Sequence, residues 1–346
     1  MLPLQLLAGP EAEARIRREG LLPELFDKVI AASGGPKWLP LAALDRHLLY
    51  RFFPTDHPLS LLGTSSGAWR CATLSDPEDD QAHRRLQQGY IHQRYERPPT
   101  PAEVDAVCEA LLAAAVGDRA HAITSNPHRR LNIIVCRGRH LNGRRHRAAQ
   151  GAGLAVTALT NLLSRRSLDW HWRRCLMSAQ PDSPFSGMTD LASVQGLLDA
   201  DNLLPTLLAT GSIPLVLSGV TGLPGMAPGR YFDGGVTDYH LDLPALKGGG
   251  LTLYPHFYPH AAPGWFDKNL RWRRARDNFN KVVILTPSPA FIATLPGGKL
   301  PDRTDFSAYD SDTRIRHWER AVALGEALVP ALEELRADPL AHLRSL

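Results

Sequence analysis

The sequence predicts an α/β protein with a central, mostly parallel sheet that is covered by helices. Two stretches, residues 27–44 and residues 59–74, each run from a short apolar segment through a glycine-rich turn into a segment with helical spacing. Strand–turn–helix units in succession imply parallel strands whose faces are covered by helices. We therefore expect a three-layer α/β/α arrangement.

Other elements follow from the same patterns. We expect strands and helices in the following ranges: strands at 29–32, 59–62, 131–136 and 281–285, and helices at 38–44, 68–74, 101–116 and 154–163. Residues from about 310 to 346 form a charged, amphipathic helical elaboration by the same criterion. Because no Gly/Ser-rich or Pro-rich linker divides the chain, the prediction is one domain over residues 1–346.

Composition and charge narrow the class of protein. The 346 residues are 44% hydrophobic and 21% charged, which is typical of a globular protein, and the net charge of +4 does not call for a nucleic-acid partner. Arg15, Arg17 and Arg18 precede any sustained apolar run, so the N-terminal segment does not resemble a signal peptide. No uncharged apolar stretch reaches the roughly 18 residues that a membrane-spanning helix needs. We expect a cytoplasmic protein.

The cysteines and histidines do not have the sequence spacing that is typical of metal ligands. The four cysteines have no C-x-x-C spacing and are expected to be buried free thiols. His256 and His260 are four residues apart beside aromatic residues, but Pro255 and Pro259 argue against a helix there. We expect neither a metal nor an organic cofactor.

A candidate nucleophile lies in the second glycine turn. Gly63-Thr64-Ser65-Ser66-Gly67 matches G-x-S-x-G between a predicted strand and a predicted helix, the context of a nucleophile elbow. Small neighbours let a substrate carbonyl approach the serine, and the helix that follows directs its positive dipole end toward a developing oxyanion. The alternative is an ordinary loop, with Ser66 as the second candidate if Ser65 is not the nucleophile.

Two further turns carry chemistry. Ser33-Gly34-Gly35-Pro36-Lys37 exposes backbone N–H groups that could bind an oxyanion or a phosphate, but it matches neither the Walker pattern nor the dinucleotide pattern, which favours an oxyanion hole. Tyr231-Phe232-Asp233-Gly234-Gly235 places a carboxylate before two glycines. Taken alone, that segment would be read as a tight turn.

The order of these motifs resembles that of the patatin-like phospholipases. That family has a glycine-rich oxyanion loop, a G-x-S-x-G elbow and an Asp-Gly-Gly or Asp-Gly-Ala turn in the same order. A fourth segment, Ala209-Thr210-Gly211-Ser212-Ile213-Pro214, is similar to the family's A-[ST]-x-[AS]-x-P segment before the acid turn. The resemblance covers about residues 28–240, and the stretch that follows carries no family motif.

The resemblance implies a lipid acyl hydrolase with a patatin-like fold, of phospholipase A or esterase type, with Ser65 as nucleophile and Asp233 as general base. It also implies an oxyanion hole and supporting glycines, at these positions: Gly34, Gly35 and Lys37 for the oxyanion hole, and Gly63, Gly67, Gly234 and Gly235 in support. The sequence departs from the family at the ends of the oxyanion loop, with Ser33 at the first glycine position and Trp38 at the last. We expect the bulky Trp38 to narrow the acyl pocket.

Two other functions remain open. One is a soluble ester or thioester hydrolase with a Ser-Asp-His triad. Its base would be one of five histidines: His240, His256, His260, His317 or His342. The other is a non-catalytic lipid-binding protein that keeps the fold.

Two stretches bear on the surroundings of the site. Residues 265–274 mix aromatics with cations, a composition expected at an anionic membrane surface, and peripheral contact would use Trp265, Arg271, Trp272, Arg273 and Arg274. A solvated helix with two core-facing tryptophans is the alternative. Residues 137–147 begin at Arg137 and also hold Arg139, Arg144, Arg145 and Arg147, and a solvated basic loop is the default interpretation.

Overall fold

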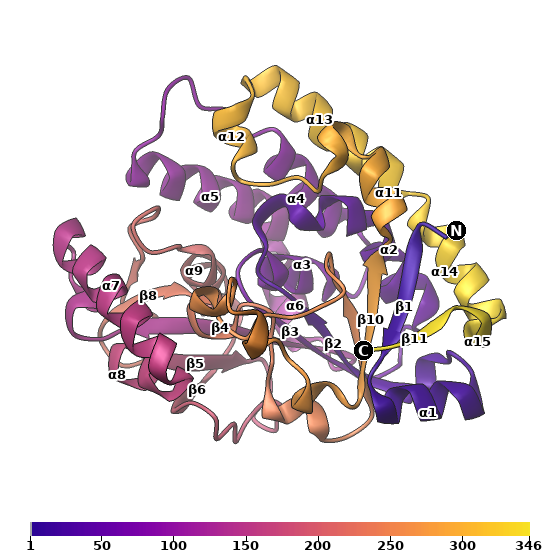
Figure 1. Cartoon of the computed structure of the whole chain (residues 1–346). Coiled ribbons are helices and arrows are strands. Elements are labelled where there is room, and N and C mark those ends of the chain that lie inside the picture. Colours follow the sequence, from indigo (N-terminus) through magenta and orange to yellow (C-terminus); the bar gives the residue numbers. More distant parts are fainter. Residues whose placement is uncertain (1) are drawn as a thin grey trace.

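The computed structural model describes residues 2–346 and contains one large sheet flanked by helices (Figure 1). The strands are β1 (Leu4–Ala8), β2 (Phe26–Ala31), β3 (Leu59–Gly63), β4 (Arg129–Gly138), β5 (Trp172–Ser178), β6 (Ser193–Leu197), β7 (Val220–Thr221), β8 (Arg230–Asp233), β9 (Leu251–Pro255), β10 (Val282–Pro287) and β11 (Leu343–Ser345). The helices are α1 (Pro10–Glu19), α2 (Ala42–His47), α3 (Ser66–Leu74), α4 (Gln81–Ile91), α5 (Pro101–Val116), α6 (Ala120–Ser125), α7 (Arg147–Leu163), α8 (Leu168–His171), α9 (Ala200–Gly211), α10 (Gly235–Asp238), α11 (Pro289–Thr294), α12 (Asp305–Ala308), α13 (Ser311–Gly325), α14 (Leu328–Ala337) and α15 (Pro339–His342).

The strand order is β11-β1-β10-β9-β2-β3-β4-β5-β6, with β8 paired to β4 and β7 paired to β8. The central strands β10, β9, β2, β3 and β4 run parallel to one another. Antiparallel pairs occur where β1 meets β10 and where β4 meets β5 and β8. The predicted α/β class with a mostly parallel central sheet is confirmed.

Both faces of β4 are buried by apolar packing. Ile134 and Val135, which are successive residues of β4, both belong to the large core cluster, and Cys136 belongs to a smaller cluster with Leu154 of α7 and Val236 of α10. Because successive side chains of a strand point to opposite faces, apolar residues cover both faces of the sheet here.

Strand register brings the motif turns to one edge of the sheet. Ala31 at the end of β2 pairs with Gly63 at the end of β3, and Gly63 pairs with Ile133 of β4. On β4, Val135 lies opposite Asp233 of β8. The glycine loop, the serine turn and the acid turn thus leave the sheet side by side.

Most predicted elements are present, but the helix expected at residues 38–44 is partly wrong. The chain forms a 3₁₀ helix over Gly35–Leu41 and becomes α-helical only in α2. Pro36 and Pro40 lie within this stretch and have no N–H group to donate. The tighter helix follows from these two prolines.

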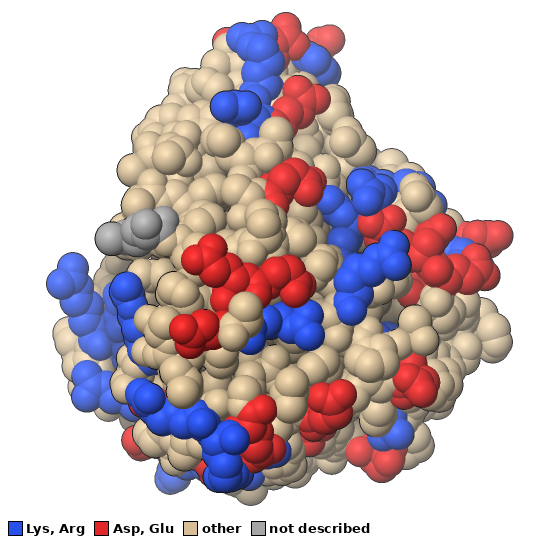
Figure 2. Space-filling view, turned by 90° about the vertical axis from the view of Figure 1, so that its right-hand side faces the viewer, with Lys and Arg blue, Asp and Glu red and all other residues tan. Residues whose placement is uncertain are grey.

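The C-terminal region is helical as expected, but its end is not. After α13, α14 and α15, the chain forms β11, which pairs in parallel with β1, Leu343 lying opposite Leu6. On the side of the molecule where both termini lie, acidic and basic side chains are mixed over a largely uncharged surface (Figure 2). Basic side chains gather along the lower left edge of this view, and acidic ones lie near its centre.

Two other expectations concern the thiols and the membrane. Cys71, Cys108, Cys136 and Cys175 are all free and buried, which confirms the prediction. Among the helices of residues 2–346, none has the length and apolarity to cross a bilayer.

Candidate active site

Ser65 lies in a strained turn between β3 and α3. Its backbone has φ 53° and ψ −132°, and only 3% of the residue is exposed. A non-glycine residue in such a region costs about 1–3 kcal/mol and persists only where the surrounding packing enforces it. The geometry is that of a nucleophile elbow, as the motif predicts.

The flanking glycines are required by close backbone packing. A Cβ atom on Gly63 would lie 2.4 Å from the Ala68 backbone nitrogen, and one on Gly67 would lie 2.1 Å from the Ala31 carbonyl oxygen. A Cβ on Gly234 would lie 2.1 Å from the Ile134 carbonyl oxygen. These glycines let the turns approach the strands, which explains the spacing of the motif.

Asp233 ends β8 in a buried position, with 6% of the residue exposed. Its Oδ1 atom accepts a hydrogen bond from the Gly235 N–H at 2.7 Å. Burial raises the pKa of Asp233, and this shift is opposed first by the positive charge of Arg303 and then by Ser65 and the Gly235 N–H. Ser65 is therefore near enough to Asp233 to lower its pKa, although within residues 2–346 the Ser65 hydroxyl forms no hydrogen bond with this carboxylate.

The hydroxyl of Ser33 links the three turns. It lies 2.9 Å from Thr64 Oγ1 and 3.5 Å from Asp233 Oδ1, and Thr64 in turn donates to the Asp238 carbonyl at 3.1 Å. A Cβ on Gly235 would lie 2.4 Å from the Ser33 Oγ atom. The departure from glycine at position 33 thus adds a polar contact to the acid, which sequence reasoning missed.

The segment from Ala209 to Pro214 accepts hydrogen bonds from the backbone N–H groups of both Ser65 and Asp233. Thr210 Oγ1 accepts a hydrogen bond from the Ser65 N–H at 2.9 Å and donates to the Ile134 carbonyl at 2.7 Å. The Ser212 carbonyl accepts a bond from the Asp233 N–H at 2.9 Å. The small polar residues of this segment therefore fix the backbone of the nucleophile and of the acid.

The glycine loop supplies two free donors beside the serine. In residues 2–346, neither the Gly34 N–H nor the Gly35 N–H donates to another residue, and Gly35 lines the same cavity as Ser65. The bonds of a 3₁₀ helix beginning at Gly35 direct the Lys37 N–H at the Gly34 carbonyl. The Lys37 side chain forms an ion pair with Asp302. Gly34 and Gly35 are thus better placed than Lys37 to bind an oxyanion.

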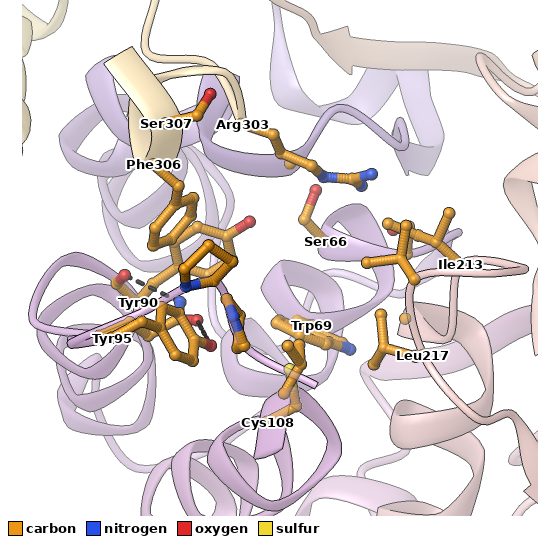
Figure 3. A pocket seen from close by; sticks show the side chains of 18 of the residues that line it. Ser66, Trp69, Tyr90, Tyr95, Cys108, Ile213, Leu217, Arg303, Phe306 and Ser307 are labelled. Atoms are coloured by element: carbon orange, nitrogen blue, oxygen red, sulfur yellow. Dashed lines mark hydrogen bonds between the residues drawn. The ribbon is translucent and has the colours of Figure 1, made fainter. Parts of the chain in front are cut away.

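A cavity of about 680 Å³ opens beside Ser65 (Figure 3). Much of its wall is apolar: Trp69, Tyr90, Val104, Ile213, Leu217 and Phe306. Trp38 does not line this wall; it is buried behind it, with its ring centroid 6.0 Å from that of Tyr90. The expectation that Trp38 itself narrows the pocket is therefore wrong, because Tyr90 stands between Trp38 and the cavity.

The candidate histidines lie elsewhere. Among the residues that the structure describes, none of the five histidines has Ser65 or Asp233 as a hydrogen-bond partner. His240 Nδ1 accepts from the Ala262 N–H at 3.0 Å, and His256 Nε2 lies 3.2 Å from the His260 carbonyl. Burial lowers the pKa of both His240 and His256 well below the usual value. They are neutral packing residues.

The aromatic and basic stretch at 265–274 forms two short 3₁₀ turns rather than a helix. Its tryptophans do not face the core: Trp272 is 74% exposed, and Trp265 is also exposed. Arg273 donates to Asp267 at 2.9 Å and to the Leu162 carbonyl at 3.0 Å, which places the second turn against the end of α7. The solvated helix with core-facing tryptophans is therefore wrong.

The second basic stretch runs from the end of β4 into the start of α7. Arg139 donates to the Asp169 carbonyl, and the Arg144 carbonyl accepts a bond from Arg230. Arg144 and Arg145 are exposed, in keeping with a solvated basic loop. In residues 2–346, no group of three or more His, Cys, Asp or Glu side chains is arranged to hold a metal ion.

Comparison with protein-family models, with curated proteins and with solved structures gives no significant match to this chain. A fold by itself does not define an activity, so the residues of the site must carry the functional conclusion.

Proposed function

We propose that this chain is a serine acyl hydrolase with a patatin-like fold that cleaves carboxylic esters of lipids, with Ser65 as nucleophile and Asp233 as general base. The observation that carries the proposal is a buried, strained serine that lines an apolar cavity and lies near a buried carboxylate whose pKa it lowers. The cavity size suits an acyl chain. No metal or organic cofactor takes part.

The proposed reaction has two steps. Asp233 takes the proton of the Ser65 hydroxyl as Oγ attacks the ester carbonyl, and the N–H groups of Gly34 and Gly35 stabilise the oxyanion. The tetrahedral intermediate collapses, the alcohol leaves with the proton from Asp233, and an acyl-serine remains. Water then attacks the acyl-serine and gives a proton to Asp233. As the second tetrahedral intermediate collapses, Asp233 passes this proton to Ser65 Oγ, which regenerates the serine and releases the carboxylic acid. The raised pKa of Asp233 makes it a stronger base than a solvated aspartate.

An exposed apolar surface supports lipid as the substrate class. Leu159, Leu162 and Leu163 of α7 are exposed, Leu163 by 89%, and Trp272 lies on the turn that packs against the end of this helix. We call these four residues the α7 face. Apolar side chains beside Arg271 and Arg274 suit the surface of an anionic membrane.

The alternatives remain a triad hydrolase of soluble esters or thioesters, and a non-catalytic lipid-binding protein. A triad would need a histidine to move between Ser65 and Asp233. A binding protein would not need the strained serine turn, which costs stability. Neither alternative has an observation that favours it over the dyad.

An active-serine probe tests the proposal. A fluorophosphonate should label the wild-type protein, and mass analysis of the labelled peptide should place the adduct on Ser65 rather than Ser66. Ser65→Ala should lose labelling and ester hydrolysis. Ser75→Ala, which removes a hydroxyl that donates to the Cys71 carbonyl, should keep both. An unlabelled wild type, or an active Ser65→Ala variant with native circular dichroism, would remove the dyad from consideration.

A further inference from the structure

Arg303 comes from the part of the chain that has no family motif, yet it lies at the candidate active site. A Cβ on Gly35 would lie 2.9 Å from the Arg303 Nε atom, so the side chain crosses the glycine loop. It lines the large cavity together with Ser65, and it also lines a small adjoining cavity together with Asp233. Figure 3 shows the guanidinium reaching over the cavity on the side of Ser66.

The charge of Arg303 is uncompensated by an ion pair. Among residues 2–346 it has no carboxylate within salt-bridge distance, because the neighbouring Asp302 pairs with Lys37. Its positive charge acts on Asp233 and lowers the pKa of that acid, but only against the larger effect of burial. An arginine that is held at a cavity without a partner is free to bind an anion from solution.

A second cation lines the small cavity together with Arg303. Lys268 lines the small cavity and lies 4.1 Å from the centroid of the Tyr239 ring, without a carboxylate partner among the described residues. It is exposed at the rim, and partial desolvation together with the charges of Arg303 and Lys37 lowers its pKa to about 8. Two cations thus face a single carboxylate, which leaves the site with excess positive charge.

Ser66 provides an independent observation. It lines the large cavity beside Arg303, only 4% of the residue is exposed, and its Oγ atom has no hydrogen-bond partner in the described chain. A buried hydroxyl without a partner costs free energy, and such groups normally find one. A ligand oxygen in the cavity would supply it.

We propose that Arg303 and Ser66 form a subsite for an anionic oxygen group of the substrate, a phosphate or a carboxylate, with Lys268 adding to the positive potential. This inference rests on the proposed function for the ester that is cleaved. The guanidinium has the planar donor geometry that binds such groups through two parallel hydrogen bonds. The apolar wall holds the acyl chain, and the substrate is therefore an amphiphilic anionic ester rather than a neutral one.

Binding to the full-length Ser65→Ala protein tests this subsite without depending on turnover. The ligands are a matched pair with one acyl chain, 1-oleoylglycerol 3-phosphate and 1-oleoylglycerol, measured by isothermal titration calorimetry below their aggregation concentrations. Adding Arg303→Gln should weaken binding of the phosphate ligand about tenfold or more, because a charge-assisted hydrogen bond is lost, and should change binding of the neutral ligand less than about threefold. Arg316→Gln, the same change on the exposed side of α13, should change neither.

A short-chain ligand and a second variant extend this test. 1-Butyrylglycerol 3-phosphate binding as tightly as the oleoyl compound would identify a small soluble ester, whereas a requirement for the long chain would identify a lipid head group. Adding Ser66→Ala should weaken binding of the phosphate ligand by a smaller factor than Arg303→Gln. Equal losses for the charged and neutral ligands, or no loss with Arg303→Gln, would overturn the subsite. Failure of the dyad, in contrast, would appear only in turnover and labelling of the wild type.

Discussion

The dyad and the cavity beside it are built in different ways. The dyad depends on backbone contacts: Gly67 and Gly234 each approach a strand carbonyl so closely that a Cβ would lie 2.1 Å from it. The cavity depends on side chains that arrive from distant segments, such as Phe306 of α12 and Leu217 in the loop after α9. Backbone contacts tolerate few residue types, whereas a cavity wall accepts many. Sequence motifs therefore predict the proposed catalytic residues, whereas they do not predict which substrate the cavity accepts.

The largest expected effect is a loss of kcat on substitution of Asp233, which lies in a turn fixed by backbone contacts. Asp233→Asn keeps the shape of the side chain and an oxygen that can accept the Gly235 N–H, but the amide cannot take the serine proton. We expect kcat to fall by about 10²–10⁴-fold, the range that a general base contributes. Steady-state kinetics on a short-chain ester checks this, and kcat within threefold of the wild type would contradict the role of the acid.

The same variant should be more stable than the wild type at neutral pH. Burial raises the pKa of Asp233 above its value in the unfolded chain, so the folded state holds the proton more tightly. The resulting stabilisation is present below the unfolded pKa and is lost as pH rises through the folded pKa. Asp233→Asn removes the buried charge, so its Tm should exceed that of the wild type at pH 7. The difference should shrink as the pH falls from the raised pKa of Asp233 in the folded state to the pKa of a free aspartate, and should not change further below that. An equal or lower Tm at pH 7 would show that the carboxylate is stabilised in the fold.

The sequence predicts the turns around the proposed dyad well because glycine-rich turns are recognised from a few adjacent residues. The turns that carry Ser65 and Asp233, and the loop of Gly34 and Gly35, could be placed at one sheet edge because strand–turn–helix order puts such turns there. The position of Arg303 could not be predicted, since it depends on the path of the chain between the strand at 281–285 and the C-terminal helices, where no motif marks it. The strand β11 was missed for a similar reason: three residues after a helix carry too little pattern to predict pairing with β1.

An intermediate effect is expected at Thr210, which holds the backbone of Ser65 against β4. Thr210→Val keeps the volume but leaves the Ser65 N–H without its acceptor, and an unsatisfied buried N–H costs about 1–3 kcal/mol. The free energy of unfolding should fall by that amount, and kcat should fall about tenfold because the nucleophile is displaced. Thr210→Ser, which keeps the hydroxyl, should restore most of kcat. If Val and Ser variants are equally active, the hydrogen bond does not position the nucleophile.

The smallest effect is expected at the α7 face, which concerns access of the substrate and not its cleavage. Trp272 is 74% exposed, so Trp272→Ala should leave the Tm and the hydrolysis of a soluble short-chain ester unchanged. At a membrane, burial of part of the indole contributes roughly 1 kcal/mol, so binding to vesicles that contain anionic lipid should weaken about fivefold, as measured by co-sedimentation. Leu340→Ala, which removes an exposed apolar side chain on α15, is the matched control and should bind vesicles as the wild type does. A loss equal to that of the control would mean that the α7 face does not contact the bilayer. A loss of soluble-ester activity in Trp272→Ala would instead connect this turn to the dyad, and the separation between catalysis and access would not hold.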